Sequence, residues 1–445
     1  MINDKISVFG LGYVGLSTAV CLASRGIKVL AVDIDEDKVG KINHGKSPIH
    51  EPGLEELLSK SVSNGFLTAT HEHEKAVLNT SVSFVAVGTP SRPDGSIDLS
   101  DVEKASRQIG QDLRKKQDWH LVVVRSTVIP GTCGQLVKSA LESASLKRCG
   151  VDWGLGMNPE FLREGMAIQD TFNPDRVIIG QHDQRSGDHL ESIYRQFYGK
   201  NVPPMLRMSL VNAELTKYAN NAFLGMKVSY INMMANLCQR IPGADVTQVA
   251  DAIGLDKRIG RQFLNAGLGY GGSCFPKDLK ALRSFAEKIG VDLSLVDATI
   301  RTNDLQPLKA VEMTRNLVGD VRNKRIAILG LSFKPDTDDV REAVSMKIIQ
   351  HLLKMGGRVV GYDPAAVNNA RKILGDSITY ASSALECLRE ADACIVATEW
   401  EEFKRLRPED FLKSMRNPAV VDGRRIYDPK DFERKVKFSA IGLNT

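Results

Sequence analysis

A thiol, a lysine and a carboxylate follow directly after a glycine-rich turn. Residues 267–278 place four glycines within six residues and then Cys274, Lys277 and Asp278. A cysteine on such a turn beside a cation can have a lowered pKa and act as a nucleophile. A buried structural cysteine in an ordinary turn is the alternative. Because crowded glycines let the backbone approach a ligand closely, we favour a nucleophilic Cys274.

A long segment further upstream carries a second set of polar side chains. Residues 209–240 contain no proline and one glycine, Gly225, which predicts a single long helix. Lys217 and Asn221 are spaced i, i+4 and share one face of it. The neighbouring Asn220 and Asn221 are poor helix formers, which suggests that a ligand needs their amides. An ordinary solvated face fits the same pattern.

Further polar groups follow predicted strands. Glu160 comes after Asn158 and Pro159, behind a short apolar segment, where its carboxylate could bind substrate or a water. A turn with a capping glutamate is the simpler interpretation of this motif alone. Ser126 and Thr127 close another predicted strand. Strand C-termini line the ligand cleft of parallel sheets, so these hydroxyls could face a cofactor.

The chain begins with a dinucleotide-binding pattern. Gly10, Gly12 and Gly15 follow a short apolar strand and open a helix, which places the helix N-terminus against a pyrophosphate. Asp33 ends the next strand and could bond the ribose hydroxyls. Its charge would repel a 2′-phosphate, so NAD is favoured over NADP. A turn without ligand and a flavin site are the alternatives.

The elements that position these groups form two similar sets. Apolar strands at residues 5–9, 27–32, 82–87 and 121–124 alternate with helical segments, and a second set covers residues 325–330, 359–363, 393–398 and 419–422. This βαβ alternation predicts two doubly wound, Rossmann-like α/β domains joined by the long central helix. We expect boundaries of 1–205, 206–319 and 320–445. The second set lacks the glycine motif and must build its phosphate site differently.

Composition bounds the class of protein. The 445 residues are 42% hydrophobic and 25% charged, with 59 basic and 54 acidic residues, which indicates a globular protein and not a nucleic-acid-binding or membrane one. No secretion signal precedes the first strand. The seven cysteines are widely spaced and form no C-x-x-C, so we expect reduced thiols in a cytoplasm and no metal site.

Taken together, these motifs resemble the nucleotide-sugar 6-dehydrogenase family over nearly the whole chain. The blocks that carry the resemblance lie at residues 10–15, 45–54, 87–90, 125–128, 158–162, 267–278, 333–342 and 422–425. They occur in the family's order and at similar spacing. The resemblance implies NAD as cofactor, a sugar nucleotide as substrate, and a homodimer or higher homo-oligomer.

The resemblance also implies a role for individual residues. Cys274 would be the nucleophile, flanked by Lys217 and Asp278, with Asn221, Glu160 and Thr127 completing the reacting centre. The expected cofactor-binding residues are Gly10, Gly12, Tyr13, Val14, Gly15, Asp33, Lys38, Thr89, Ser126, Glu164 and Lys277, although Tyr13 could simply pack. The expected substrate-binding residues are Phe161, Leu162, Arg163, Lys217, Asn221, Arg258, Phe263, Gly271, Phe333, Lys334 and Arg424, with Arg258 reaching into a partner subunit.

These residue types suit two successive oxidations at carbon 6 of the sugar. A thiolate that traps the aldehyde as a thiohemiacetal keeps it bound, and the second oxidation gives a thioester for hydrolysis. Asp278 or Glu160 would position the water, and Lys217 would stabilise the oxyanions. Either Asp278, through a water, or Lys217 could take the first proton.

Separate blocks of sequence bear on the choice of substrate. Residues 45–84 also resemble GDP-mannose dehydrogenases, whereas residues 173–180 and 258–264 are more similar to the branch that oxidises UDP-glucose to UDP-glucuronate. We therefore expect UDP-glucose, with GDP-mannose or another UDP-sugar as the alternative. Two other classes, hydroxyacid dehydrogenases and a nucleotide sensor, would not need Cys274, Lys217 and Asp278 together.

Overall fold

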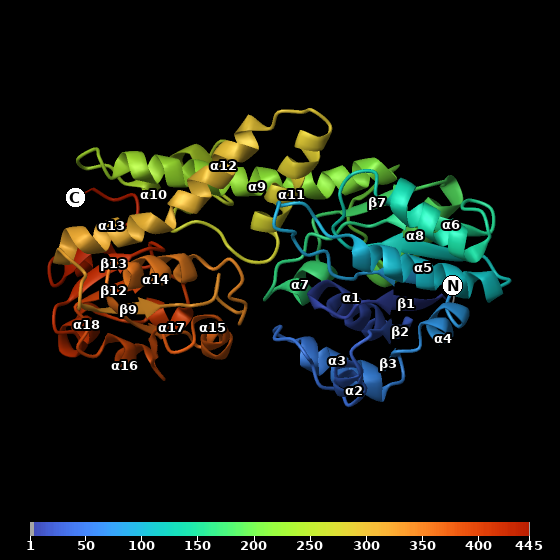
Figure 1. Cartoon of the computed structure of the whole chain (residues 1–445), viewed down its shortest axis with the longest axis horizontal. Helices are drawn as coiled ribbons and strands as arrows, with labels where there is room; N and C mark the ends of the chain where they lie inside the picture. Colours follow the sequence, from blue (N-terminus) through green and yellow to red (C-terminus); the bar gives the residue numbers. More distant parts are fainter. Residues whose placement is uncertain (1–3, 445) are drawn as a thin grey trace. The chain divides into compact units, whose positions relative to one another are not determined.

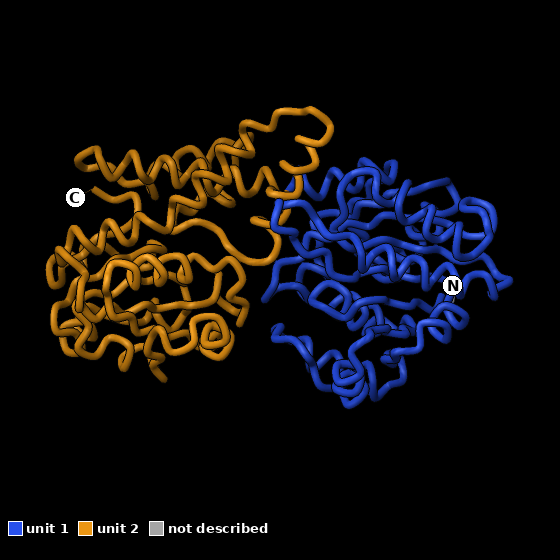
Figure 2. The backbone as a smooth tube through the Cα atoms, in the orientation of Figure 1, with its two compact units in different colours: residues 1–220 blue, residues 221–445 orange. Residues whose placement is uncertain are grey.

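The computed structural model describes residues 4–444 and forms two compact units, Met1–Asn220 and Asn221–Thr445 (Figures 1 and 2). Each unit is built on its own sheet. The finer division into three domains at residues 205 and 319 stays a prediction.

The first unit contains an eight-stranded sheet in the order β3-β2-β1-β4-β5-β6-β7-β8. Its strands are β1 (Lys5–Phe9), β2 (Lys28–Val32), β3 (Leu67–Thr70), β4 (Val82–Val85), β5 (His120–Val124), β6 (Trp153–Met157), β7 (Val177–Gln181) and β8 (Met205–Ser209). Its helices are α1 (Tyr13–Ser24), α2 (Glu36–Asn43), α3 (Leu54–Ser63), α4 (His73–Leu78), α5 (Ser100–Lys115), a π-helical turn (Cys133–Val137), α6 (Lys138–Ser145), α7 (Ala167–Phe172) and α8 (Gln184–Tyr198).

Unbroken apolar strands give this sheet a buried core on both faces. Along β5, Leu121 and Val123 pack on one side with α1, α3 and α8, whereas Val122 and Val124 pack on the other with α5 and α6. The predicted strands at residues 5–9, 27–32, 82–87 and 121–124 are therefore confirmed, with ends that differ by one or two residues.

One strand pair departs from the parallel pattern. β7 runs antiparallel to β6, whereas every other neighbouring pair in this sheet is parallel. An antiparallel neighbour begins at the edge where the preceding strand ends. Residues 158–176, which connect β6 to β7, therefore start and finish at the carboxyl edge of the sheet.

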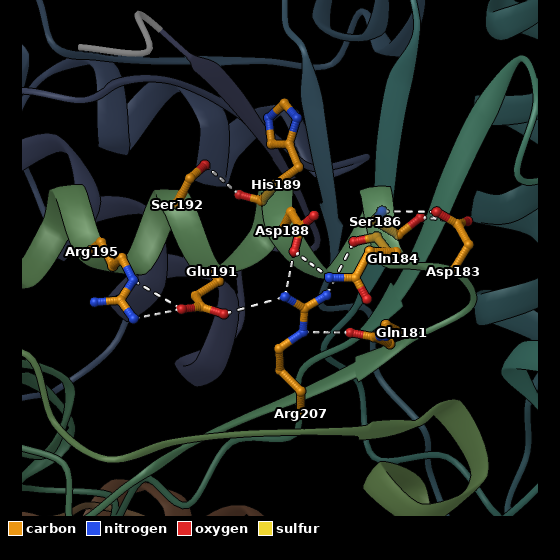
Figure 3. A network of polar contacts seen from close by, with 10 residues as sticks. All are labelled: Gln181, Asp183, Gln184, Ser186, Asp188, His189, Glu191, Ser192, Arg195 and Arg207. Carbon is orange, nitrogen blue, oxygen red and sulfur yellow. Dashed lines mark hydrogen bonds and ion pairs between the residues drawn. The ribbon is translucent and has the colours of Figure 1, made fainter.

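A polar network fixes the strands beyond this reversal. Arg207 on β8 donates to Gln181 at the end of β7 with an Nε–Oε1 distance of 2.6 Å, and it also bonds Asp188 on α8 (Figure 3). Glu191, one turn further along α8, accepts from Arg207 at 3.4 Å and pairs with Arg195. The guanidinium group thus joins the two last strands to the helix beside them.

The second unit contains a six-stranded parallel sheet in the order β11-β10-β9-β12-β13-β14. Its strands are β9 (Arg325–Leu329), β10 (Arg358–Tyr362), β11 (Thr379–Tyr380), β12 (Ala393–Val396), β13 (Ala419–Asp422) and β14 (Lys437–Ala440). Its helices are α10 (Val246–Gly254), α11 (Phe275–Lys288), α12 (Ser294–Leu305), α13 (Pro307–Val318), α14 (Val344–Lys354), α15 (Val367–Leu374), α16 (Ala384–Leu388), α17 (Glu401–Lys404), α18 (Pro408–Ser414) and α19 (Pro429–Phe432).

This second sheet repeats the plan of the first, as the sequence predicts. Ile326 and Ile328 of β9 pack with α13 and α14, and Ala327 and Leu329 pack with α16 and α18. The predicted long helix is also confirmed: α9 (Leu210–Cys238) runs for 29 residues and contributes to both units. None of the described helices is long and apolar enough to cross a membrane.

Candidate active site

The three glycines of the first loop each have a distinct steric role. A Cβ on Gly15 would lie 1.8 Å from the Gly10 carbonyl oxygen, and a Cβ on Gly10, whose φ is +89°, would lie 2.8 Å from the Ala86 oxygen. A Cβ on Gly12 would meet nothing within 4 Å. Gly12 is also the N-cap of α1, and no side chain caps that helix. The open N-terminus fits the pyrophosphate of NAD.

Asp33 lies at the end of β2, where it meets this loop. Its Oδ2 accepts from the Leu11 amide at 2.7 Å and from Lys38 Nζ at 3.0 Å. Burial alone would raise the pKa of Asp33, but these donors outweigh it and hold the pKa below its ordinary value. The carboxylate is therefore ionised at neutral pH. This charge fits the ribose hydroxyls of NAD and opposes the 2′-phosphate of NADP.

The predicted hydroxyls lie at the carboxyl ends of β4 and β5, which are neighbours in the sheet. Ser126 Oγ donates to the Val87 oxygen at 2.7 Å, and Thr89 is buried. Tyr13 donates to the His50 oxygen at 3.2 Å, so its hydroxyl bonds within the protein. The expected binding roles of these residues stay predictions.

The carboxylate of Glu160 and the ammonium of Lys217 form a buried pair. Lys217 Nζ donates to the Glu160 backbone oxygen at 2.7 Å and to its Oε1 at 2.9 Å, and both side chains are about 5% exposed. The Leu162 amide donates to Oε2 at 2.6 Å. Burial would raise the pKa of Glu160, but the charge and hydrogen bond of Lys217 lower it. Glu160 is therefore an ionised carboxylate.

Phe161, next in sequence, lies under two cations. The Arg176 guanidinium lies 4.0 Å from the ring centroid and Lys217 Nζ lies 5.5 Å from it. Arg163 instead pairs with Asp170 on α7 at 2.6 Å. The connection between β6 and β7 is thus bonded to α9 near both ends, through Glu160 and through Arg176, which donates to Asn220 at 2.7 Å.

Two buried glutamates that the sequence did not assign to a role hold the loops of this region. Glu51 accepts from the amides of Gly165 and Ala167, each at 2.7 Å. Glu214 on α9 accepts from the amides of Gly131 at 2.6 Å and Cys133 at 2.7 Å. Burial raises the pKa of Glu214, against these hydrogen bonds. Glu214 lies one turn before Lys217, so α9 holds two loops at once.

The second unit contains the predicted thiol and its carboxylate. Cys274 is the N-cap of α11 and is half-buried, and its backbone oxygen accepts from the Asp278 amide at 2.8 Å. Asp278 is 1% exposed; its Oδ2 accepts from Asn221 Nδ2 at 2.7 Å and its Oδ1 from Lys277 Nζ at 2.6 Å. Lys277, predicted to bind cofactor, is thus seen bonded to Asp278.

The other six cysteines share a feature that bears on their reactivity. Burial raises the pKa of every one of them, and these residues are Cys21, Cys133, Cys149, Cys238, Cys387 and Cys394. A thiol that stays protonated is a poor nucleophile. They therefore suit packing and not nucleophilic catalysis.

The glycine turn before Cys274 packs against the second sheet. A Cβ on Gly272 would lie 2.7 Å from the Phe333 ring, and one on Gly271 would lie 2.3 Å from the Glu342 oxygen. Arg424 donates to the Gly269 oxygen at 3.2 Å. The structure thus brings together Gly271, Phe333 and Arg424 of the predicted substrate set.

Three other predicted substrate residues make their described contacts away from that turn. Lys334 Nζ lies 5.8 Å from the centroid of the Phe333 ring. The Phe263 ring centroid lies 6.2 Å from that of Phe275, at the start of α11. Arg258 is exposed and pairs with Asp256 at 2.6 Å, so nothing in the single chain tests its predicted reach into a partner.

Three family models match successive parts of the chain. Residues 4–198 match the NAD binding domain of the UDP-glucose/GDP-mannose dehydrogenase family, residues 211–305 its central domain, and residues 327–429 its UDP binding domain. The chain belongs to the UDP-glucose/GDP-mannose dehydrogenase family. The predicted resemblance is confirmed, and so are NAD as the cofactor and a UDP-sugar as the substrate.

Individual members of the family are similar over their full length. A UDP-glucose 6-dehydrogenase of Haloferax volcanii is 44% identical over 95% of this chain and 97% of its own. A UDP-glucose 6-dehydrogenase of Bacillus subtilis is 41% identical over 96% and 91%. The structure of a UDP-glucose dehydrogenase from Pyrobaculum islandicum, 42% identical, superposes with a TM-score of 0.91 over 99% of this chain and 98% of the other.

Proposed function

We propose that this protein is an NAD-dependent UDP-glucose 6-dehydrogenase that oxidises its substrate twice, from alcohol to carboxylate. The full-length relatives named above support the substrate. The observation that carries the chemistry is the half-buried thiol of Cys274 one turn before a carboxylate, Asp278, that Asn221 and Lys277 hold in place. A four-electron oxidation needs such a group, because a free aldehyde would leave the enzyme between the two steps.

NAD, when bound, accepts the hydride in both oxidations. In the first, carbon 6 loses a hydride and the hydroxyl loses a proton, which leaves an aldehyde. The Cys274 thiolate adds to the aldehyde carbon, and the resulting oxyanion takes up a proton to give a thiohemiacetal. Loss of a second hydride and of the hydroxyl proton gives a thioester. Water then cleaves the carbon–sulfur bond, which releases the acid and the thiol.

The polar groups have separate parts in this scheme. The positive charge of Lys217 stabilises the oxygen that becomes negative during thiol addition and hydrolysis. The carboxylates of Asp278 and Glu160 are the two candidates for orienting the hydrolytic water. Thr127, directly after Ser126 beyond the end of β5, is the last residue of the proposed reacting centre.

The test is the number of NADH molecules formed per sugar nucleotide at completion. UDP-glucose, GDP-mannose and UDP-N-acetylmannosamine are each supplied in limiting amount and followed by absorbance. Two NADH per UDP-glucose is the expected result. Turnover with GDP-mannose alone would show that the proposed substrate is wrong and would leave the proposed mechanism in place. One NADH per sugar would contradict the covalent scheme.

Cys274→Ser is the matched variant for that assay. A serine hydroxyl does not replace the thiol as a nucleophile at neutral pH, so we expect uronic acid formation to stop. UDP and NAD should still bind, which fluorescence titration checks. Full acid production by this variant would rule out the thioester.

We also propose that the protein acts as a homodimer formed through α9. Four large apolar side chains on the second unit's part of α9, and Ile241 just after the helix, are each about half exposed; the four are Phe223, Tyr230, Met233 and Leu237. Their spacing of three, four or seven residues places them along one stripe, and exposed stripes of this kind are typical of interfaces. The proposed location is the cytoplasm, which suits the free cysteines among the described residues.

A further inference from the structure

The glycine turn before Cys274 is held by amide side chains from neighbouring helices. Asn232 on α9 accepts from the Gly267 amide at 2.8 Å, and Gln306, between α12 and α13, donates to the Gly267 oxygen at 2.8 Å. Both backbone groups of one glycine are therefore bonded to side chains. Asn232 is 0% and Gln306 1% exposed, so neither bond competes with water.

A second residue of the turn is bonded in the same manner. Asn303 on α12 accepts from the Tyr270 amide at 2.8 Å and donates to the Tyr270 oxygen at 2.9 Å. Asn303 is 6% exposed. The Asn303 amide thus bonds both backbone groups of Tyr270, as a neighbouring strand would. A carboxylate could not do this, because it only accepts hydrogen bonds.

The packing around these bonds is close. Gly269 has a φ of +99°, and a Cβ there would lie 2.8 Å from Asn303 Oδ1. Asn236, one turn after Asn232 on α9, donates to Gln306 Oε1 at 2.9 Å. The amide group of Gln306 is thereby fixed from both ends. We call Asn232, Asn303 and Gln306 the amide clamp.

The turn needs such a clamp because its own residues do not define its shape. Four glycines in six residues leave a backbone with a large choice of conformations. Yet the turn leads directly into Cys274, and covalent catalysis requires the thiol at a reacting distance and angle. Bonds at Gly267 and Tyr270 fix the turn at two points, seven and four residues before the thiol.

We propose that Asn303 and Gln306 are positioning residues for this reaction: they hold the glycine turn so that α9, α12 and α13 set the place of the Cys274 thiol and of the sugar nucleotide beside it. The inference rests on the role proposed for Cys274. Neither residue touches a reacting atom, and each acts through the backbone of the turn.

Near-isosteric variants test the clamp. Asn303→Asp and Gln306→Glu keep the shape of each side chain but remove its donor to the turn and place a negative charge against a carbonyl oxygen. We expect kcat with UDP-glucose to fall at least tenfold in each. The rate of Cys274 alkylation by iodoacetamide, followed from pH 6 to 9, should change at least fivefold. The Kd for NAD should stay within twofold.

The control variant is Asn417→Asp. Asn417 also donates to a backbone oxygen, that of Asp392, at 3.1 Å in the same unit but away from the turn. We expect it to keep kcat and the alkylation profile. The neutral variants Asn303→Leu and Gln306→Met replace the acidic ones if those do not fold. Cys274→Ser gives the background alkylation of the other thiols.

The outcomes separate the two proposals. Wild-type turnover and alkylation in both clamp variants would overturn the clamp. A loss of activity that matches the unfolded fraction, with an unchanged alkylation profile in the folded part, would overturn it too, because it would show a purely structural role. Acid production by Cys274→Ser would instead overturn the function proposed for the thiol.

Discussion

Asp33 and Asp363 each accept a hydrogen bond from a backbone amide at the end of a different sheet, but their carboxylates differ in how many other groups they bond. Asp33 Oδ2 accepts from the Leu11 amide at 2.7 Å, and Asp363 Oδ2 accepts from the Leu331 amide at 2.8 Å. Asp363 also accepts from Trp400 Nε1 at 3.1 Å and is 2% exposed. Its carboxylate is occupied, so we expect the ribose of NAD at the first loop and not at the second.

Asp33→Ala should weaken the choice between the two nicotinamide cofactors. The variant loses a charged acceptor for the ribose hydroxyls, which is about 1.5–3 kcal/mol, or roughly one to two powers of ten in kcat/KM for NAD. It also loses the repulsion of a 2′-phosphate, so kcat/KM for NADP should rise or stay. Steady-state kinetics with both cofactors measures the ratio. An unchanged ratio would contradict the role given to Asp33.

Glu160→Gln should destabilise the protein in a pH-dependent way. The variant removes the carboxylate charge that pairs with the buried Lys217 ammonium, which costs about 3–5 kcal/mol at pH 7. The folded pKa of Glu160 is lowered, so its contribution is present above the unfolded value and is lost as pH falls through the folded one. Urea unfolding from pH 7 to pH 3 should show the wild type and the variant converging.

Glu56→Gln is the control for that experiment. Glu56 pairs with Lys60 at 2.6 Å, but both side chains are about 70% exposed. Exposed pairs of this kind contribute little to stability. A pH-independent gap between Glu160→Gln and wild type would show that the ionised carboxylate is not what stabilises this region.

Sequence could identify part of this chemistry and not the rest. Cys274, Lys277 and Asp278 are adjacent along the chain, so their joint role follows from spacing. The contact of Glu51 with the Gly165 amide spans 114 residues, and that of Asn303 with Tyr270 spans 33. Asparagine and glutamate have many uses in proteins. Their partners are set by how the chain folds back, which no local pattern records.

At the scale of elements, substitution by alanine should lower stability at one glycine of the first loop and leave it unchanged at another. Gly15→Ala places a Cβ 1.8 Å from the Gly10 oxygen, so α1 must shift away from the loop and stability should fall by several kcal/mol. Gly12→Ala meets no protein atom within 4 Å and should leave stability within about 0.5 kcal/mol of wild type. Its methyl group instead occupies the space for pyrophosphate.

Thermal unfolding and NAD titration together check this pair. Gly12→Ala should bind NAD at least tenfold more weakly and unfold at the wild-type temperature. If Gly12→Ala bound NAD normally, the open side of the loop would not be the pyrophosphate site. Tight NAD binding by Gly15→Ala at wild-type stability would show that the loop can relax.

The elements themselves were largely predictable, with one informative exception. Buried parallel strands are short apolar runs between turns, and the runs at β1, β2, β4, β5 and in the second sheet stand out for that reason. The antiparallel direction of β7 did not follow from its residues. Hydrophobicity records that a strand is buried on both faces, and it does not record which way the strand runs.

At the scale of the whole molecule, Leu237→Glu should separate the proposed dimer. A charge in the middle of an apolar interface has no solvent and no partner, so association should weaken at least a hundredfold. Light scattering during size-exclusion chromatography measures the mass. Leu385→Glu, an equally exposed leucine on α16, is the control. A wild-type protein with the mass of one chain would contradict the dimer.

The reversal between β6 and β7 has a consequence for how such a protein diverges. The 19 residues between these strands leave and rejoin the sheet at one edge. Apart from residues such as Glu160, which is bonded to α9, mutation and selection can therefore alter this stretch while the strands stay paired. Enzymes descended from a common ancestor with this arrangement can diverge in the middle of this connection while the strands of the sheet stay as they were.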